Sequence, residues 1–267
     1  MPLSVEGRPD EDDAVRVVHA ALDAGVTLID TADAYCLGHG EVGHNERLVA
    51  RALATYGGDT SQVLVATKGG HTRPPDDSWA LDGSREHLRT ACEASLRALG
   101  VEAVGLYQFH RPDPQVPWAE SVGALEELRA EGKVRFVGVS NADPAQIREA
   151  AAITPLAAVQ NEFSPRFRSS RPELELCAEL GIAFLPWSPL GGMGKAAALG
   201  QEHAPFAEAA RERRVSPQQV CLAWHLAQAE VVLPIPGASR PQSVRDSAAA
   251  ADLELTADEL ARLDAAG

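Results

Sequence analysis

Seven short apolar runs recur along the chain, and each is apolar over its whole length instead of at every second position. A strand that is covered on both faces has this pattern, whereas a strand with one solvated face alternates. The runs are TLID at 27–30, VLVAT at 63–67, VGLYQF at 104–109, VRFVGV at 134–139, AAVQN at 157–161, IAFLPW at 182–187 and VVLPI at 231–235. They predict a buried parallel sheet.

Segments with helical periodicity lie between these runs. In residues 11–24 the apolar side chains recur at three and four positions, and Gly25 follows where a helix would end. Residues 84–100 repeat the pattern between a serine and a glycine. Further helix starts are marked by an N-cap before proline at Asp143 and Pro144, and by capping-box positions at Ser216 with Gln219 and at Thr256 with Glu259.

A repeated order of strand and helix predicts a parallel sheet with right-handed crossovers, and seven or eight such units close most simply into a barrel. The length of 267 residues suits the roughly 250 residues of a (β/α)8 TIM barrel. We therefore expect an α/β fold with one barrel domain over residues 1–267. Before the first helix only MPLSVEGRPD is available, and its glycine and proline predict a first strand that is short or missing.

The charge balance excludes several classes of partner. With 38 acidic and 24 basic side chains the net charge is −14, which repels nucleic acid and anionic membrane surfaces. No apolar run approaches the roughly 18 residues of a membrane span, and the acidic start differs from a signal peptide. The four cysteines form no CxxC pair, and HGEVGH at 39–44 lacks the HExxH spacing of a zinc site. We expect a cytoplasmic protein without a metal, nucleic-acid or membrane partner.

Polar side chains lie at the ends of the first three runs. Asp30 ends the first run and Tyr35 follows it, while Lys68 and His110 come directly after the second and third. In a (β/α)8 barrel the carboxyl ends of the strands form the active face. Each residue alone has a structural explanation: a turn cap, a filler of the barrel mouth, a surface lysine or a structural histidine. Their joint placement favours a shared catalytic site.

The four side chains suit proton delivery. Tyrosine has an ordinary pKa of about 10 and is a weak acid near neutrality. An ammonium about 4 Å away stabilises its phenolate by on the order of 4 kcal/mol at an effective dielectric of about 20, or roughly three pKa units before desolvation is subtracted. Lys68 would supply this charge and Asp30 would keep the lysine ionised. His110 would hydrogen-bond and orient the same substrate oxygen.

Seven segments resemble the aldo-keto reductase family in order and spacing, over nearly the whole chain: TLIDTADAY, VATKGG, LYQFHRPD, VGVSN, AVQNEFS, WSPLGG and IPGASR. The resemblance implies a barrel that binds a nicotinamide cofactor, usually NADPH, without a Rossmann fold. It implies that Asp30, Tyr35, Lys68 and His110 form a catalytic tetrad, with Tyr35 donating a proton as hydride reaches a carbonyl carbon. The N-terminal hairpin and first strand that the family usually has are short or missing here.

The resemblance also implies a cofactor site. Ser140, Asn141 and Gln160 would bind the carboxamide, and Trp187 would stack on the nicotinamide, where a tyrosine is common in the family. The loop SPLGG offers backbone N–H groups with little steric bulk, which suits a pyrophosphate. It contributes Ser188, Pro189, Leu190 and Gly192.

The last segment follows the final strand and leads into a helix, at the corner where barrels often bind phosphate. It contributes Pro236, Gly237, Ala238, Ser239 and Arg240. Ser239 and Arg240 would hold a 2′-phosphate, which favours NADPH over NADH. The family often has a Glu-Asn pair reaching adenosine where this chain has Asp246 and Ser247. Trp79 either lines the substrate pocket or packs within its loop.

Three functions compete. The favoured one is an NADPH-dependent reductase of small-molecule aldehydes or ketones with Tyr35 as the general acid. The second is a nicotinamide-cofactor-binding protein with little or no catalysis, because a barrel that lacks one strand has two unpaired edges. The third is a Schiff-base enzyme that uses Lys68 as its nucleophile.

Overall fold

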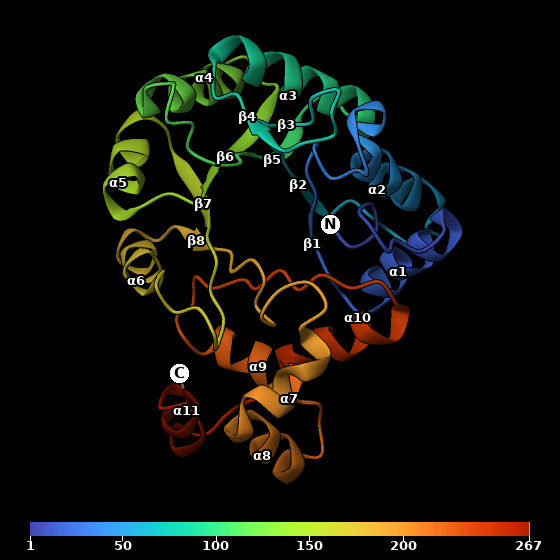
Figure 1. Ribbon diagram of the computed structural model, residues 1–267, viewed down its shortest axis with the longest axis vertical. Helices are drawn as coiled ribbons and strands as arrows, with labels where there is room; N and C mark the ends of the chain where they lie inside the picture. Colours follow the sequence, from blue (N-terminus) through green and yellow to red (C-terminus); the bar gives the residue numbers. More distant parts are fainter. Residues whose placement is uncertain (267) are drawn as a thin grey trace.

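Six of the seven apolar runs form one parallel sheet in the computed structural model, which describes residues 1–266. The sheet curls, and its helices lie on the outer side (Figure 1). Neighbouring strands follow the order β1-β2-β5-β6-β7-β8. Their bounds are Leu28–Asp30, Leu64–Gly69, Val104–Phe109, Val134–Ser140, Leu156–Gln160 and Ala183–Phe184.

The seventh run, residues 231–235, lies beside β8 and is shorter as a strand than its sequence predicts. Phe184 of β8 donates its N–H to the carbonyl of Val231 at 2.8 Å and accepts from the N–H of Leu233 at 2.8 Å. This exchange makes a single parallel bridge between Phe184 and Val232. The run therefore lies next to β8 in the curled sheet but pairs with it at one residue only.

The barrel is open between β1 and residues 231–235. Residues 1–10 form turns and extended chain, so the prediction that the first strand is short or missing is confirmed. Within residues 1–266 no backbone pairing joins β1 to the 231–235 run. On the outer side, the helices α1 (Glu11–Asp23) and α10 (Pro241–Ala248) pack against each other, as Figure 1 shows. Helix packing thus bridges a gap that strands leave open.

The remaining helices surround the sheet and the lower end of the molecule in Figure 1. Large buried side chains, among them Trp224, Phe163 and Phe184, fill the space between sheet and helices. No helix within residues 1–266 is both long and apolar enough to cross a lipid bilayer. The helices are α2 (His44–Thr55), α3 (Arg85–Leu99), α4 (Trp118–Ala130), α5 (Pro144–Ile153), α6 (Arg171–Leu180), α7 (Leu199–Glu202), α8 (Ala204–Arg213), α9 (Pro217–Leu226) and α11 (Ala257–Asp264).

Short elements occupy the loops. A small antiparallel pair, β3 (His71–Thr72) and β4 (Ala80–Leu81), follows the end of β2. Three 3-10 turns lie at His39–Glu41, Ala196–Ala198 and Ala249–Asp252. The β3–β4 pair places His71 one residue beyond the glycines that follow Lys68.

Side-chain caps begin several of the predicted helices. Thr256 and Glu259 form the predicted capping box of α11, and Asp143 caps α5. Ser216 caps α9 by accepting from the N–H of Gln219. The predicted role of the glutamine side chain is wrong, because its amide donates to Asp246 Oδ1 at 2.6 Å instead of returning to the cap. Gln219 therefore joins α9 to α10.

Candidate active site

Close packing of two glycines fixes the end of β2. A Cβ on Gly69 would lie 2.0 Å from the hydroxyl oxygen of Tyr107, and one on Gly70 would lie 2.7 Å from the ring of Phe109. Gly70 also has a positive φ of 105°, which glycine adopts without steric cost. The sequence KGG is therefore explained by the aromatic side chains of β5, and this packing positions Lys68.

Lys68 lies at the centre of a cluster of polar groups inside the curl of the sheet. Its fully buried ammonium donates to Asp30 Oδ2 at 2.6 Å, to the carbonyl oxygen of Thr31 at 2.9 Å and to the hydroxyl oxygen of Tyr35 at 3.2 Å. Three donors on the ammonium thus meet three acceptors. Asp30, Tyr35 and Lys68 are brought together as one hydrogen-bonded unit.

Two amide side chains hold the other oxygen of Asp30. Gln160 donates to Asp30 Oδ1 at 2.8 Å, and Gln108 donates to the same oxygen at 3.3 Å. Gln160 also donates to Gln108 Oε1 at 3.4 Å. The sequence interpretation missed Gln108, although an amide within the apolar run VGLYQF, two residues before His110, was a signal for it. The carboxylate of Asp30 is therefore fixed from both sides.

His110 completes the group of predicted catalytic residues. Its ring meets the ring of Tyr35 edge to face at a centroid distance of 5.7 Å, and the ring of His71 stacks on it at 4.1 Å. Burial, together with the positive charge of Lys68, holds the pKa of His110 well below its usual range, so the imidazole is neutral. Its Nδ1 atom is buried and has no hydrogen-bond partner within residues 1–266. His71 was not singled out from the sequence.

Burial and charge act in opposite directions on Tyr35. Burial raises the pKa of the phenol more than the nearby Lys68 ammonium lowers it. We expected the pKa of Tyr35 to fall, and this expectation is wrong. Desolvation of the phenolate costs more than its attraction to the Lys68 ammonium returns. For Lys68, burial opposes the charged form, but Asp30 and Tyr35 outweigh it and the pKa of the ammonium is raised. The lysine is thus ionised and the tyrosine keeps its proton.

The predicted carboxamide-binding residues lie side by side at the ends of β6 and β7. Asn141 donates to the carbonyl oxygen of His110 at 3.0 Å and to Ser140 Oγ at 2.9 Å. The indole Nε1 of Trp187 donates to Asn141 Oδ1 at 3.2 Å. Asn141 has a positive φ of 59°, which costs energy in most residues and is least unfavourable in asparagine. These contacts connect Trp187 to the His110 side of the cluster.

The loop of residues 188–192 has an unusual backbone. Ser188, Gly191 and Gly192 have φ values of 52°, 90° and 105°. Leu190 is buried, and the carbonyl oxygen of Pro189 accepts from the thiol of Cys221. Gly191 donates its N–H to the carbonyl oxygen of Ser188 at 2.9 Å, so the loop turns tightly, and its contact with a pyrophosphate stays a prediction.

The predicted phosphate-binding segment, residues 236–240, precedes α10. Ser239 and Arg240 are exposed, and no hydrogen bond or ion pair from the Arg240 guanidinium to another residue occurs within residues 1–266. A Cβ on Gly237 would lie 2.8 Å from the ring of Pro2, so the start of the chain packs beside this segment. The Arg240 side chain is free to meet an anion near the first turn of α10.

Asp246 and Ser247, the remaining predicted cofactor residues, lie on α10. Asp246 accepts from Ser216 at 2.6 Å and from Gln219 at 2.6 Å, one hydrogen bond on each carboxylate oxygen. Ser247 is half-buried in the same helix. The structure therefore gives Asp246 a place in the α9–α10 packing, in addition to the predicted contact with adenosine.

Trp79 stands beside the His71–His110 pair. Its ring meets the ring of His71 at 5.5 Å, and the guanidinium of Arg73 lies over it at 4.4 Å. The side chain is 49% exposed. Trp79, His71 and His110 thus form a continuous row of rings that leads away from Tyr35.

A family model described as Aldo/keto reductase family matches residues 3–267. Among curated relatives, the protein named probable aldo-keto reductase 1 of Glycine max is 35% identical over 94% of this chain and 78% of its own length. An uncharacterized oxidoreductase of Schizosaccharomyces pombe is 33% identical over 97% of this chain and 80% of its own length. The chain belongs to the aldo/keto reductase family and is an oxidoreductase.

Solved structures with the same fold support this assignment. A glycerol dehydrogenase from Gluconobacter oxydans superimposes with a TM-score of 0.83 at 29% identity, covering 97% of this chain and 86% of that one. An aldo/keto reductase from Klebsiella pneumoniae, in complex with NADP and acetate, has a TM-score of 0.80 at 28% identity and covers 96% and 85% of the two chains. The predicted barrel class is confirmed, and the sheet of this chain is open between β1 and residues 231–235.

Proposed function

We propose that the protein is an NADPH-dependent reductase of aldehydes or ketones and that Tyr35 is its general acid. In this function, residues 1–267 act as a single domain. One observation carries it: the Lys68 ammonium lies within hydrogen-bond distance of both Asp30 and the Tyr35 hydroxyl. That arrangement keeps a cation beside a phenol in a site where a substrate oxygen gains negative charge. Such fixed charges stabilise the transition state of carbonyl reduction.

The residues present suit a nicotinamide cofactor at two separate places. Trp187 offers a flat ring whose indole N–H is already engaged by Asn141, so the ring face is available for stacking. Arg240 offers an exposed guanidinium beside a helix start, which suits a phosphate. Two similar structures of aldo-keto reductases from Klebsiella pneumoniae are complexes, one with NADP and acetate and one with NADPH. NADPH, when bound, supplies the hydride.

The chain itself orients the carbonyl and delivers the proton. Since the Nδ1 atom of His110 is buried without a partner, the favoured neutral tautomer carries its proton on Nε2, and that N–H hydrogen-bonds the substrate oxygen. Tyr35 transfers its phenolic proton to the same oxygen as negative charge develops there. Lys68 lowers the cost of the phenolate that remains, and Asp30 keeps the lysine charged.

Substitution of Tyr35 by Phe tests the general acid. We expect turnover of a panel of activated aldehydes and ketones to fall by at least about a hundredfold, while the dissociation constant of NADPH, measured by quenching of tryptophan fluorescence, stays within about twofold. The binding measurement is the control for folding. Persistent turnover in the variant would show that another group donates the proton.

Cofactor binding without catalysis is the second candidate, and the open side of the barrel favours it. The gap between β1 and residues 231–235 lies beside the strand that carries Asp30. NADPH binding and carbonyl turnover measured on the same preparation separate the two functions, since saturable binding with no turnover of any carbonyl tested supports the second.

A Schiff-base mechanism through Lys68 is disfavoured by the same contacts. An amine attacks a carbonyl only when it is unprotonated, and Asp30 and Tyr35 raise the pKa of this ammonium. Treatment with borohydride in the presence of carbonyl compounds would leave a stable adduct on Lys68 if that mechanism operated.

A further inference from the structure

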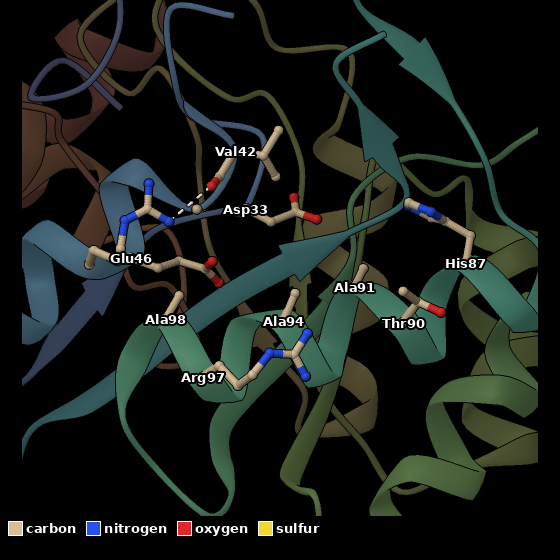
Figure 2. Close-up of a pocket in the computed structure, with 11 residues that line it drawn as sticks. Asp33, Val42, Glu46, His87, Thr90, Ala91, Ala94, Arg97 and Ala98 are labelled. Atoms are coloured by element: carbon tan, nitrogen blue, oxygen red, sulfur yellow. Dashed lines mark hydrogen bonds between the residues drawn. The ribbon is translucent and has the colours of Figure 1, made fainter. Parts of the chain in front are cut away.

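A second cavity opens on the helix side of the sheet, between α2 and α3. Its volume is about 490 Å³, within the roughly 300–1,000 Å³ of ordinary small-ligand pockets. Figure 2 shows the side chains of its lining converging from both helices and from the loop that follows β1. Neither the predicted catalytic residues nor the predicted cofactor residues line it. The cavity is therefore separate from the proposed reductase site.

Small side chains on α3 create the space. Ala91, Ala94 and Ala98 follow each other at three and four positions, which places them on one face of the helix. Figure 2 shows this face turned toward the loop that carries Asp33. A larger side chain at the central position would narrow the cavity, so part of its volume depends on the alanines.

A buried carboxyl group with an unmet hydrogen-bonding capacity points into this space. Asp33 is only 5% exposed. Its Oδ1 accepts from the N–H of Ala34 at 2.6 Å, whereas its Oδ2 accepts no hydrogen bond from any group within residues 1–266. In Figure 2 the carboxyl group lies between Val42 and Ala91 and faces the cavity.

Two further buried groups make the inner wall polar. The Nε2 atom of His87 is buried without a partner among the described residues. The carboxyl group of Glu46 is 1% exposed and accepts from Thr67 at 2.6 Å. Burial raises the pKa of Asp33, and the nearby Glu46 carboxyl raises it further. The cavity wall thus carries a carboxyl group whose ionised form a bound cation would stabilise.

The chemistry of the inner wall selects the class of ligand. A buried carboxylate is stabilised when it is paired and hydrogen-bonded, and an ammonium supplies both the charge and the donors. A metal ion fits less well, because no group of three metal-ligating side chains occurs within residues 1–266. The net charge of −14 attracts cations to the protein as a whole. Arg47 and Arg97 also line the cavity, and their charges suit an anionic group at the far end of a ligand. The guanidinium of Arg47 is held by the carbonyl oxygen of Val42 at 3.0 Å.

We propose that this cavity binds a small primary ammonium compound, with its ammonium group on Asp33 Oδ2 and its carbon chain along the alanines of α3. A carboxylate at the opposite end of the compound lies between Arg47 and Arg97.

Calorimetric titration with three matched probes tests the proposal: propylamine, 4-aminobutanoate and butanoate. We expect one equivalent of propylamine or of 4-aminobutanoate to bind and butanoate not to bind. The zwitterion binds more tightly because the two arginines hold its carboxylate. If neither ammonium probe saturates the protein at millimolar concentration, the proposal is wrong.

Two variants locate the binding site. Asp33→Asn keeps the oxygen that accepts from Ala34 and removes the charge, and it should weaken binding by about tenfold or more. Ala94→Leu narrows the cavity beside the alanine row without changing a charge and should weaken binding by about tenfold or more. Arg89→Gln, whose side chain pairs with Glu131 outside the cavity, is the control and should bind as the unaltered protein does. If the Asn variant fails to fold, the Leu variant decides, and undiminished binding in it would overturn the proposal.

The readout is direct binding. The absence of carbonyl reduction would therefore contradict the proposed function and leave this site unaffected.

Discussion

At the scale of single residues, the active-site cluster depends on a balance between burial and charge. Lys68 remains ionised because Asp30 and Tyr35 together outweigh its desolvation. Tyr35 does not gain a low pKa, because the same burial disfavours its phenolate more than the lysine favours it. The lysine therefore reduces the free-energy cost of forming the buried Tyr35 phenolate. Without it, the phenolate formed in the reaction would have no nearby cation.

Substitution of Lys68 by Met removes that cation while keeping the length of the side chain. The ammonium lies 3.2 Å from the Tyr35 hydroxyl, and an interaction on the order of 4 kcal/mol is lost, so we expect turnover to fall roughly a thousandfold. Asp30 keeps the amide donors of Gln108 and Gln160. Circular dichroism checks the fold. Lys133→Met, at an exposed ion pair, is the control, and an equal loss in both variants would contradict the assigned role.

A buried histidine outside the site should control acid stability. His225 of α9 is fully buried, and burial lowers its pKa to about 4, against about 6.5 for an unperturbed histidine. As the pH falls below about 6.5, the unfolded chain takes up a proton before the folded protein does. The free energy of unfolding therefore falls between about pH 6.5 and about pH 4, by at most roughly 3 kcal/mol from this group.

Urea unfolding at about pH 7 and about pH 4.5 measures this effect, and comparison with His225→Gln isolates it. Glutamine can still donate to the carbonyl oxygen of Phe163, which His225 contacts at 3.1 Å. The variant should lose less stability than the unaltered protein over this pH interval. Equal losses would show that His225 does not titrate differently in the folded and unfolded chains.

Residues at strand ends could be predicted from the sequence, whereas side chains that act through packing could not. Asp30, Lys68 and His110 follow apolar runs, and the geometry of parallel strands then brings them to one edge. His71 gave no such signal. It reaches His110 only because the short β3–β4 pair folds back beside the end of β2. Asp33 was passed over for a similar reason, since one wall of its cavity is α3, which begins only at Arg85.

At the scale of elements, local signals predicted helix starts well and side-chain partners less well. The box of Thr256 and Glu259 forms as expected, because both partners lie within one turn. At the start of α9 the serine caps the helix, but the side-chain amide of Gln219 donates to Asp246 on α10. A hydrogen bond between two helices thus replaces the expected bond within one helix turn. The sequence of α9 alone does not predict it.

The loop before α10 allows the cofactor preference to be tested. If the exposed Arg240 guanidinium meets a 2′-phosphate, Arg240→Ala should weaken NADPH binding by about tenfold or more and leave NADH binding nearly unchanged, because only NADPH carries that phosphate. Fluorescence titration with both cofactors gives the two dissociation constants. Arg245→Ala, at an exposed position of the same helix, is the control, and an equal loss for NADPH and NADH would remove the assignment.

At the scale of the whole molecule, the repeated apolar runs and helices were sufficient to predict the barrel class and its missing first strand. The extent of the seventh run could not be predicted in the same way. Its residues are apolar like those of the other runs, but within residues 1–266 no strand pairs with this run on the side away from β8. Only the single bridge to β8 forms.

The opening in the barrel should be visible in the exchange of backbone amides. In a parallel sheet, alternate N–H groups of a strand point to opposite neighbours, so β1, which pairs only with β2, leaves half of its amides without a strand partner. β5 pairs on both sides. Because local opening at an edge needs less free energy than opening at the centre of a sheet, a peptide covering residues 26–31 should exchange at least about tenfold faster than one covering 104–109. Hydrogen–deuterium exchange followed by mass spectrometry compares the two peptides directly. Equal protection would mean that β1 is paired on its outer edge in solution and that the sheet is closed.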